Sequence, residues 1–197
     1  MRQSTKTISS AFILLSILIC TGCQTAKEPL YKSETFKSDK IETIYVLPVA
    51  DLRFNKDKEL PKLDKWVHKI VKDKLKDKKY GCTILSDRSL VSSLTEDDLK
   101  NFDTQWVKSL GSSESRWIML FALWDARSKL TFGSTGNAEV SLYMFDKQDG
   151  SLIWKDKYVE RFGMMGFAGM LMKGSMLGTA VKNAIMQLMI NFPKNKT

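Results

Sequence analysis

The order of apolar and polar positions between residues 44 and 192 predicts alternating strands and helices. The run IYVLPVA (44–50) is continuously apolar, as expected for a strand that is covered on both faces. YGCTILS (80–86) predicts a second short strand, and Thr95 begins a capping box before a helix over residues 96–110. Between the two strands, a helix is predicted by one stripe of apolar residues at helical spacing, with lysines on the opposite side. The stripe consists of Leu63, Trp66, Val67, Ile70, Val71 and Leu75.

The second half of the pattern predicts three strands and a last helix. RWIMLFALWDA (116–126) has the strongest signal for a buried strand. NAEVSLYMFD (137–146) alternates with period two and is joined by a short turn to SLIWKDKYVERF (151–162), so we expect an antiparallel hairpin. The last helix carries one apolar stripe: Met176, Leu177, Ala180, Val181, Ala184, Ile185, Leu188 and Met189. The order β-α-β-α-β-β-β-α predicts an α/β (α+β) domain over residues 44–197, with helices on a single mixed sheet of about five strands.

The amino terminus has the pattern of a bacterial lipoprotein signal over residues 1–22. Arg2 and Lys6 precede the apolar core AFILLSILI (11–19), which is too short to span a bilayer. Gly22 then stands directly before Cys23, as in a lipobox, so we expect cleavage before Cys23 and its lipidation, palmitate included. The alternative is an ordinary secretory signal with a cysteine near its cleavage site.

The residues after Cys23 bear on location and stability. Residues 23–43 are polar, charged and without periodicity, which predicts a flexible tether. Gln24 is not the Asp that retains lipoproteins at the inner membrane, so we expect an outer-membrane anchor with the domain facing the periplasm, exposure at the cell surface being left open. Only Cys82 remains in the mature chain, which excludes an intramolecular disulfide and makes its stability depend on the core.

Several of these segments resemble a known group of proteins. IYVLPVADLR (44–53), SSESRWIMLFALWDARSKL (112–130) and MFDKQDGSLIW (144–154) are similar to an uncharacterised family of bacterial lipoproteins related to a meningococcal surface lipoprotein. That family resembles the amino-terminal domain of TolB in fold. The residues that fit its pattern are Trp124, Asp125, Gly150, Ile153 and Trp154, whereas Ser112, Ser113 and Glu114 stand where the family has Gly-Ala-Asp. The resemblance implies a TolB-like envelope lipoprotein without catalytic residues.

The residues offer no recognisable catalytic or metal site. His68 is the only histidine, no Gly-x-Ser-x-Gly motif is present, and one His with one Cys is too few for zinc. We interpret His68 as an exposed helix residue. The acidic group Glu96, Asp97 and Asp98 lies in the first turn of a predicted helix, where acids stabilise the helix dipole. We therefore predict no enzyme, no catalytic residue, no metal and no cofactor.

Basic charge is concentrated on one predicted helix. The formal net charge is +9, and lysines fill the polar side of the helix over residues 62–79. Such a side is usually only solvated, but it is also a candidate contact for an anionic surface. The candidate lysines are Lys65, Lys69, Lys72 and Lys76. Secretion and the absence of interleaved aromatic residues argue against nucleic acid.

The stretch GMMGFAGMLMKGSMLG (163–178) leaves several interpretations open. It is too short for a transmembrane helix and lacks the alternation of a lipid-facing hairpin. It is either a buried connection whose glycines allow close backbone approach, an adaptable apolar surface, or an element that forms on oligomerisation. The candidate surface consists of Met164, Met165, Phe167, Met170, Leu171 and Met172.

These observations favour a non-enzymatic lipoprotein over other classes. The leading hypothesis is a periplasmic lipoprotein, anchored to the outer membrane, that acts as a binding or scaffolding component of an envelope assembly. The alternative is a self-assembling secretion or transport accessory lipoprotein. A cell-wall hydrolase is the third hypothesis. The expected partners are the membrane, through the lipid anchor, and an envelope protein or further copies of the chain.

Overall fold

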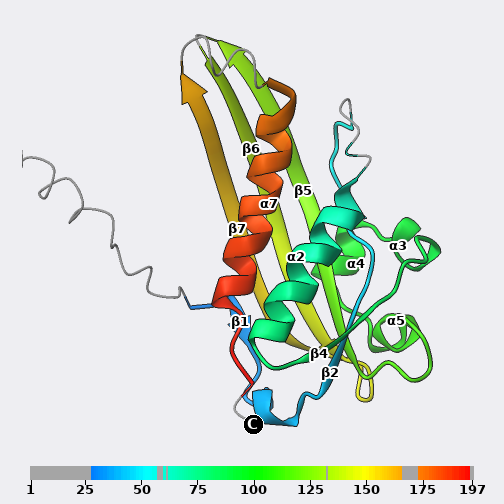
Figure 1. Ribbon diagram of the computed structural model, residues 1–197. Coiled ribbons are helices and arrows are strands. Elements are labelled where there is room, and N and C mark those ends of the chain that lie inside the picture. The colour runs from blue at the N-terminus through cyan, green and yellow to red at the C-terminus, as the bar shows by residue number, and fades with distance from the viewer. Residues whose placement is uncertain (1–27, 57–59, 61, 132, 166–172, 196–197) are drawn as a thin grey trace, which may run out of the picture.

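The computed structural model describes residues 28–56, 60, 62–131, 133–165 and 173–195 (Figure 1). These residues form one seven-stranded mixed sheet with helices on both faces, which confirms the predicted fold class. The strands are β1 (Tyr31–Lys32), β2 (Thr43–Val46), β3 (Ala50–Asp51), β4 (Gly81–Ile84), β5 (Trp117–Thr131), β6 (Gly133–Asp146) and β7 (Ser151–Met165). The helices are η1 (Ser38–Lys40), α2 (Leu63–Asp77), α3 (Ser89–Ser92), α4 (Glu96–Lys100), α5 (Thr104–Ser109) and α7 (Lys173–Asn191).

The sheet combines a parallel part with an antiparallel part. Its order is β1-β7-β6-β5-β2-β4, with β3 also paired to β5. β2 runs parallel to β4 and β5, because α2 and then α3–α5 return the chain to the same end of the sheet. β5, β6 and β7 form a long antiparallel meander, as predicted for β6 and β7. The sheet has more strands than the predicted five because the two-residue strands β1 and β3 have no periodicity to detect.

The sheet separates two hydrophobic cores, and β5 contributes to both. Met119, Phe121 and Leu123 face the core under α2 and α7, whereas Ile118, Leu120 and Ala122 face the core under α3–α5. This double coverage explains why the segment reads as a continuous apolar run. Trp124 interrupts the alternation at a β-bulge, where its Nε1 donates a hydrogen bond to Ser141 Oγ at 2.8 Å.

Both predicted amphipathic helices pack as their stripes indicate. All eight stripe residues of α7 are buried, and α2 buries Leu63, Val67, Val71 and Leu75. β6 and α7 approach closely at Gly136, where a Cβ atom would lie 2.4 Å from the carbonyl oxygen of Met176. α7 therefore lies directly on the long strands and runs along most of their length (Figure 1).

The helix predicted over residues 96–110 is two helices, which corrects that prediction. Its start is confirmed, since Thr95 and Asp98 form a capping box. α4 then ends at Lys100, and Asp103 begins α5 by accepting a hydrogen bond from the backbone N–H of Gln105 at 3.1 Å. An Asp that competes for backbone donors inside a helical pattern favours such a restart.

The flexible tether predicted for residues 23–43 is wrong over its second half. β1 pairs antiparallel with β7, and Phe36 is buried against Trp154 and Phe192, with ring centroids 5.3 and 6.2 Å apart. Ile41 is also buried in the first core. Isolated apolar residues without periodicity were enough to dock the segment, because they enter a core that distant elements build. Cys23 and the signal segment lie outside the described residues.

The carboxy terminus closes the same end of the molecule. Lys78 Nζ donates hydrogen bonds to the carbonyl oxygens of Ile190 and Phe192, at 3.2 and 2.5 Å, so a buried lysine caps the last turn of α7. Asn195 Nδ2 donates to the carbonyl oxygen of Ile41 at 3.2 Å. Both terminal segments are thus fixed to the base of the sheet.

Candidate functional site: the open face of the long strands

Part of the sheet's second face has no helix over it among the described residues. The core under α3–α5 reaches only as far as Trp124 and Ser141. Beyond them the long strands continue, covered on their other face by α7 (Figure 1). We call this region, with the adjoining edge at β1, the open face. Its side chains include Tyr31, Asp125, Arg127, Lys129, Asn137, Glu139, Lys155, Lys157, Val159 and Arg161.

The charges of β7 are divided between its two faces. The acids point to α7, where Asp156 accepts a hydrogen bond from Asn191 at 3.1 Å and Glu160 accepts one from Asn183 at 3.4 Å. The alternate positions on the open face hold Lys155, Lys157, Val159 and Arg161. The edge strand therefore presents three bases, one exposed valine and no acid on this face.

The two acids of the open face are already paired. Asp125 binds Arg127 at 2.6 Å, and Glu139 on β6 binds Lys157 at 2.5 Å. Lys155 and Arg161 form no ion pair within the described part of the chain. Burial and the neighbouring charge of Lys157 lower the pKa of Lys155, whose ammonium lies 5.1 Å from the ring centroid of Tyr143. The arrangement can attract anions but contains no group poised to react.

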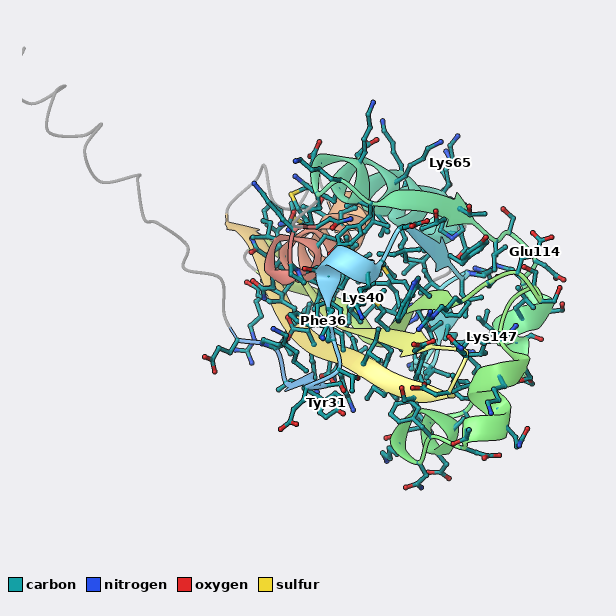
Figure 2. All side chains as sticks on the ribbon, turned by 90° about the horizontal axis from the view of Figure 1, so that it is seen from below. Tyr31, Phe36, Lys40, Lys65, Glu114 and Lys147 are labelled. Carbon is teal, nitrogen blue, oxygen red and sulfur yellow. The ribbon has the colours of Figure 1, made fainter. Side chains whose placement is uncertain are left out.

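A cleft of about 620 Å³ opens at the base of the molecule. Figure 2 views the molecule from this end. The amino-terminal segment forms one wall, with Phe36, Lys37 and Lys40. On the other wall Arg116 is held by Asp146 through contacts of 3.0 and 3.2 Å and lies 4.4 Å from the ring centroid of Trp117. Fixed charges of both signs line this cleft, so it favours neither an anion nor a cation.

A second charged group lies where β2 and β3 end, a position at which many α/β proteins bind ligands. Here the carboxylates have structural partners. Arg53 donates two hydrogen bonds of 2.7 Å to Asp51. Burial of Asp51 opposes ionisation of its carboxyl, but the hydrogen bonds and the charge of Arg53 outweigh burial, so the pKa of this carboxyl is lowered. Asp64 accepts from the backbone of Val49 at 2.9 Å and from Arg88 at 2.7 Å. This group orients the start of α2.

The predicted lysine contact forms an exposed row along α2. Lys65, Lys69, Lys72 and Lys76 are all exposed. We call them the lysine row. In Figure 2, Lys65 and Tyr31 lie on opposite sides of the molecule, so the lysine row and the open face point in opposite directions. Contact with an anionic surface therefore concerns two separate regions.

The Met- and Gly-rich stretch begins as a strand. β7 continues through Gly163 to Met165 and pairs with β6 there, so the strand predicted over residues 151–162 extends three residues into this stretch. Phe167, Met170, Leu171 and Met172 lie outside the described residues, as do the side chains of Met164 and Met165. The second half of the stretch belongs to α7, as predicted.

The two other residues considered for catalysis or metal binding, His68 and Cys82, are partly buried in the fold. His68 is half-buried and its Nε2 lies 3.3 Å from the carbonyl oxygen of Leu47, so the prediction of an exposed histidine is wrong. Burial raises the pKa of the Cys82 thiol, which keeps it in the unreactive protonated form. Among the described residues no three His, Cys, Asp or Glu side chains are grouped to hold a metal.

Comparison with known proteins shows similarity in structure without similarity in sequence. No protein family and no curated protein matches the sequence. PelC from Paraburkholderia phytofirmans, described as a dodecamer, is 13% identical, with a TM-score of 0.47 over 78% of this chain and 89% of that one. Lipoprotein GNA1162 from Neisseria meningitidis is 14% identical, with a TM-score of 0.44 over 73% and 97%. The LpoB carboxy-terminal domain from Salmonella enterica is 8% identical, with a TM-score of 0.38 over 64% and 86%.

Sequence reasoning missed the open face, although a signal for it was present. In KDKYVERF (155–162) the bases and the acids occupy alternate positions. A period-two division of charge predicts a strand with chemically distinct faces. The missing information was which face α7 covers, and that depends on the packing of residues more than twenty positions away.

Proposed function

We propose that this chain is a lipid-anchored protein of the bacterial envelope, held at the outer membrane, whose domain binds or positions an envelope partner and performs no catalysis. The observation that carries the proposal is the short apolar core followed by Gly22 and Cys23, the pattern of a lipoprotein signal. No helix of the described residues, including the 19-residue α7, has the length and apolar character needed to span a membrane. Acylation at Cys23 would then supply the attachment.

The folded domain supports a binding role through its surfaces. Its charged groups at the strand ends are engaged in ion pairs, and His68 and Cys82 are partly buried. The exposed features are a lysine row and an open sheet face on which Lys155 and Arg161 form no ion pair with any described residue. Surfaces of this kind serve recognition of anionic or protein partners.

Metabolic labelling with a palmitate analogue tests the proposal. Wild-type protein, Cys23→Ser, Cys20→Ser and Cys82→Ser are expressed in a Gram-negative host and separated into membrane fractions. We expect only Cys23→Ser to lose the label and the mature mass, while wild type fractionates with the outer membrane. Label that persists in Cys23→Ser, or an unlabelled soluble wild type, would contradict the proposal. The variants at Cys20 and Cys82 control for acylation elsewhere.

One observation favours the alternative of a self-assembling secretion or transport accessory. Beyond Lys155, β7 has a paired neighbour only on its β6 side within the described residues, and such an edge can pair with another chain. Antiparallel pairing of two copies centred on Val159 would place Lys157 opposite Arg161, which is unfavourable. Light scattering of the purified lipidated chain separates the two functions, since a closed oligomer of defined mass supports assembly.

A further inference from the structure

The domain begins very close to the expected anchor. Seven residues lie between Cys23 and Tyr31, so the eight steps between their Cα atoms reach at most about 28 Å even when the chain is fully extended. β7, with 15 residues, is itself about 50 Å long. Because β1 is held on the edge of β7 at Trp154 and Lys155, an anchor at Cys23 keeps this end of the edge within about 28 Å of the membrane.

Exposed apolar side chains gather at the same edge. Tyr31 is 44% exposed, and Val159, further along the open face, is 50% exposed. Three of the six large hydrophobic residues that are exposed among the described ones, Leu30, Tyr31 and Val159, lie in or next to β1 and β7, whereas Met186 and Ile190 lie on α7, which covers the opposite face of the sheet. Tyrosine and aliphatic side chains in such positions are favourable at a membrane–water interface.

The charge of the edge fits the same partner. Lys155, Lys157 and Arg161 point to the open face, while the acids Asp156 and Glu160 are bound by α7. Anionic headgroups attract basic residues within about a Debye length, roughly 8 Å at physiological ionic strength. The strand thus directs its bases toward one side and withholds its acids from it.

We propose that the open face along β1 and β7 lies against the phospholipid headgroups of the membrane that holds the anchor, with Tyr31 and Val159 at the interface and Lys155, Lys157 and Arg161 on anionic headgroups. The inference rests on the proposed lipidation of Cys23. It also assigns the opposite role to the lysine row. Because Lys65 lies on the other side of the molecule from Tyr31, the row faces away from this membrane (Figure 2).

Lysine footprinting of the lipidated full-length product tests the orientation. The protein is inserted from outside into preformed vesicles of phosphatidylethanolamine with phosphatidylglycerol as the anionic lipid. A membrane-impermeant acetylating reagent is then added, and each lysine is quantified by mass spectrometry relative to the detergent-solubilised protein. We expect several-fold slower acetylation of Lys155 and Lys157 in vesicles, and little change at Lys69 and Lys72.

Equal protection of all lysines, or protection of Lys69 and Lys72 instead, would overturn the orientation. The same spectra report the mass of the amino-terminal peptide. An unacylated Cys23 overturns the lipid anchor and with it this inference, whereas an acylated Cys23 with uniform lysine reactivity overturns the orientation alone.

Two double variants separate docking from folding. In Tyr31→Ser/Arg161→Gln we expect the protection of Lys155 and Lys157 to fall toward the detergent level, with an unchanged thermal melt. The control Lys69→Gln/Lys72→Gln removes two charges from the lysine row and leaves that protection intact. A control that abolishes the protection as fully as the open-face variant would contradict the proposal. In phosphatidylcholine vesicles, which lack anionic headgroups, we expect weaker protection at Lys155 and Lys157.

Discussion

The lysine row on α2 and the open face of β7 are both basic, yet they stand in different relations to the rest of the chain. The row consists of exposed lysines on the solvent side of an amphipathic helix. The bases of β7 share their face with exposed Tyr31 and Val159, and β1 joins them to the segment that follows Cys23. Figure 2 shows Tyr31 and Lys65 on opposite sides.

This contrast teaches that charge density alone does not identify a contact surface. Lysines on an amphipathic helix maintain solubility wherever the helix lies. A smaller basic group gains importance when the attachment point and apolar residues lie beside it. The comparison depends on the docked segment 31–41, because a loose segment of this length would let either surface reach the membrane.

The largest expected effect comes from releasing that segment. Phe36 is buried between Trp154 and Phe192, so Phe36→Ala leaves a cavity and should reduce the free energy of unfolding by about 3 kcal/mol. Denaturant unfolding of the purified protein measures the loss. Phe54→Ala is the matched control, since Phe54 is 106% exposed and its truncation should change stability by less than about 0.5 kcal/mol.

Equal stabilities of Phe36→Ala and Phe54→Ala would break the comparison. They would mean that the segment contributes nothing to the folded domain and does not position the anchor beside β7. A large loss of stability in Phe36→Ala alone would support the docking of this segment beside β7.

A second effect of similar or smaller size concerns alkaline pH. Burial raises the pKa of Tyr80, at the base beside Phe192, and of Tyr143, below Lys155, to about 12 in each case. The folded state then retains protons that the unfolded state releases above pH 10. Each tyrosine therefore contributes stability that is fully present below pH 10 and is lost as the pH rises through 12, by up to about 3 kcal/mol.

Tyr80→Phe and Tyr143→Phe divide this loss between the two regions. Stability measured by denaturant unfolding between pH 9 and 12 should decline less steeply in either variant than in wild type, since one of the two buried tyrosines is removed. If stability declined with pH as steeply in Tyr80→Phe as in wild type, the Tyr80 ring would not be buried at the base of the sheet. The terminal segments that carry Phe36 and Phe192 would then not cover this ring.

The elements that depend on local periodicity could be predicted from sequence. The α7 stripe, the hairpin of β6 and β7 and the capping box at Thr95 need only neighbours along the chain. The docking of Phe36 could not be predicted, because its pocket is built from Trp154 and Phe192, far away in sequence. The half-burial of His68 depends likewise on Leu47, which α2 meets only in the folded domain.

The candidate site shows the same division. Alternation of charge in residues 155–162 is visible in the sequence, and so is the lysine row. Which of the two lies nearer to the proposed anchor at Cys23 follows only from the pairing of Tyr31 with Lys155. The Met side chains of the candidate apolar surface lie outside the described residues, so their role stays a prediction.

Fluorescence quenching in vesicles tests the central claim most directly. In a Cys82→Ser background, an environment-sensitive dye is attached at Val159→Cys or, as the matched control, at Lys72→Cys, and the lipidated proteins are inserted into vesicles that carry a spin label on the lipid headgroup. The orientation predicts strong quenching of the dye at position 159 and weak quenching at position 72. Equal quenching at both positions, or stronger quenching at position 72, would contradict it.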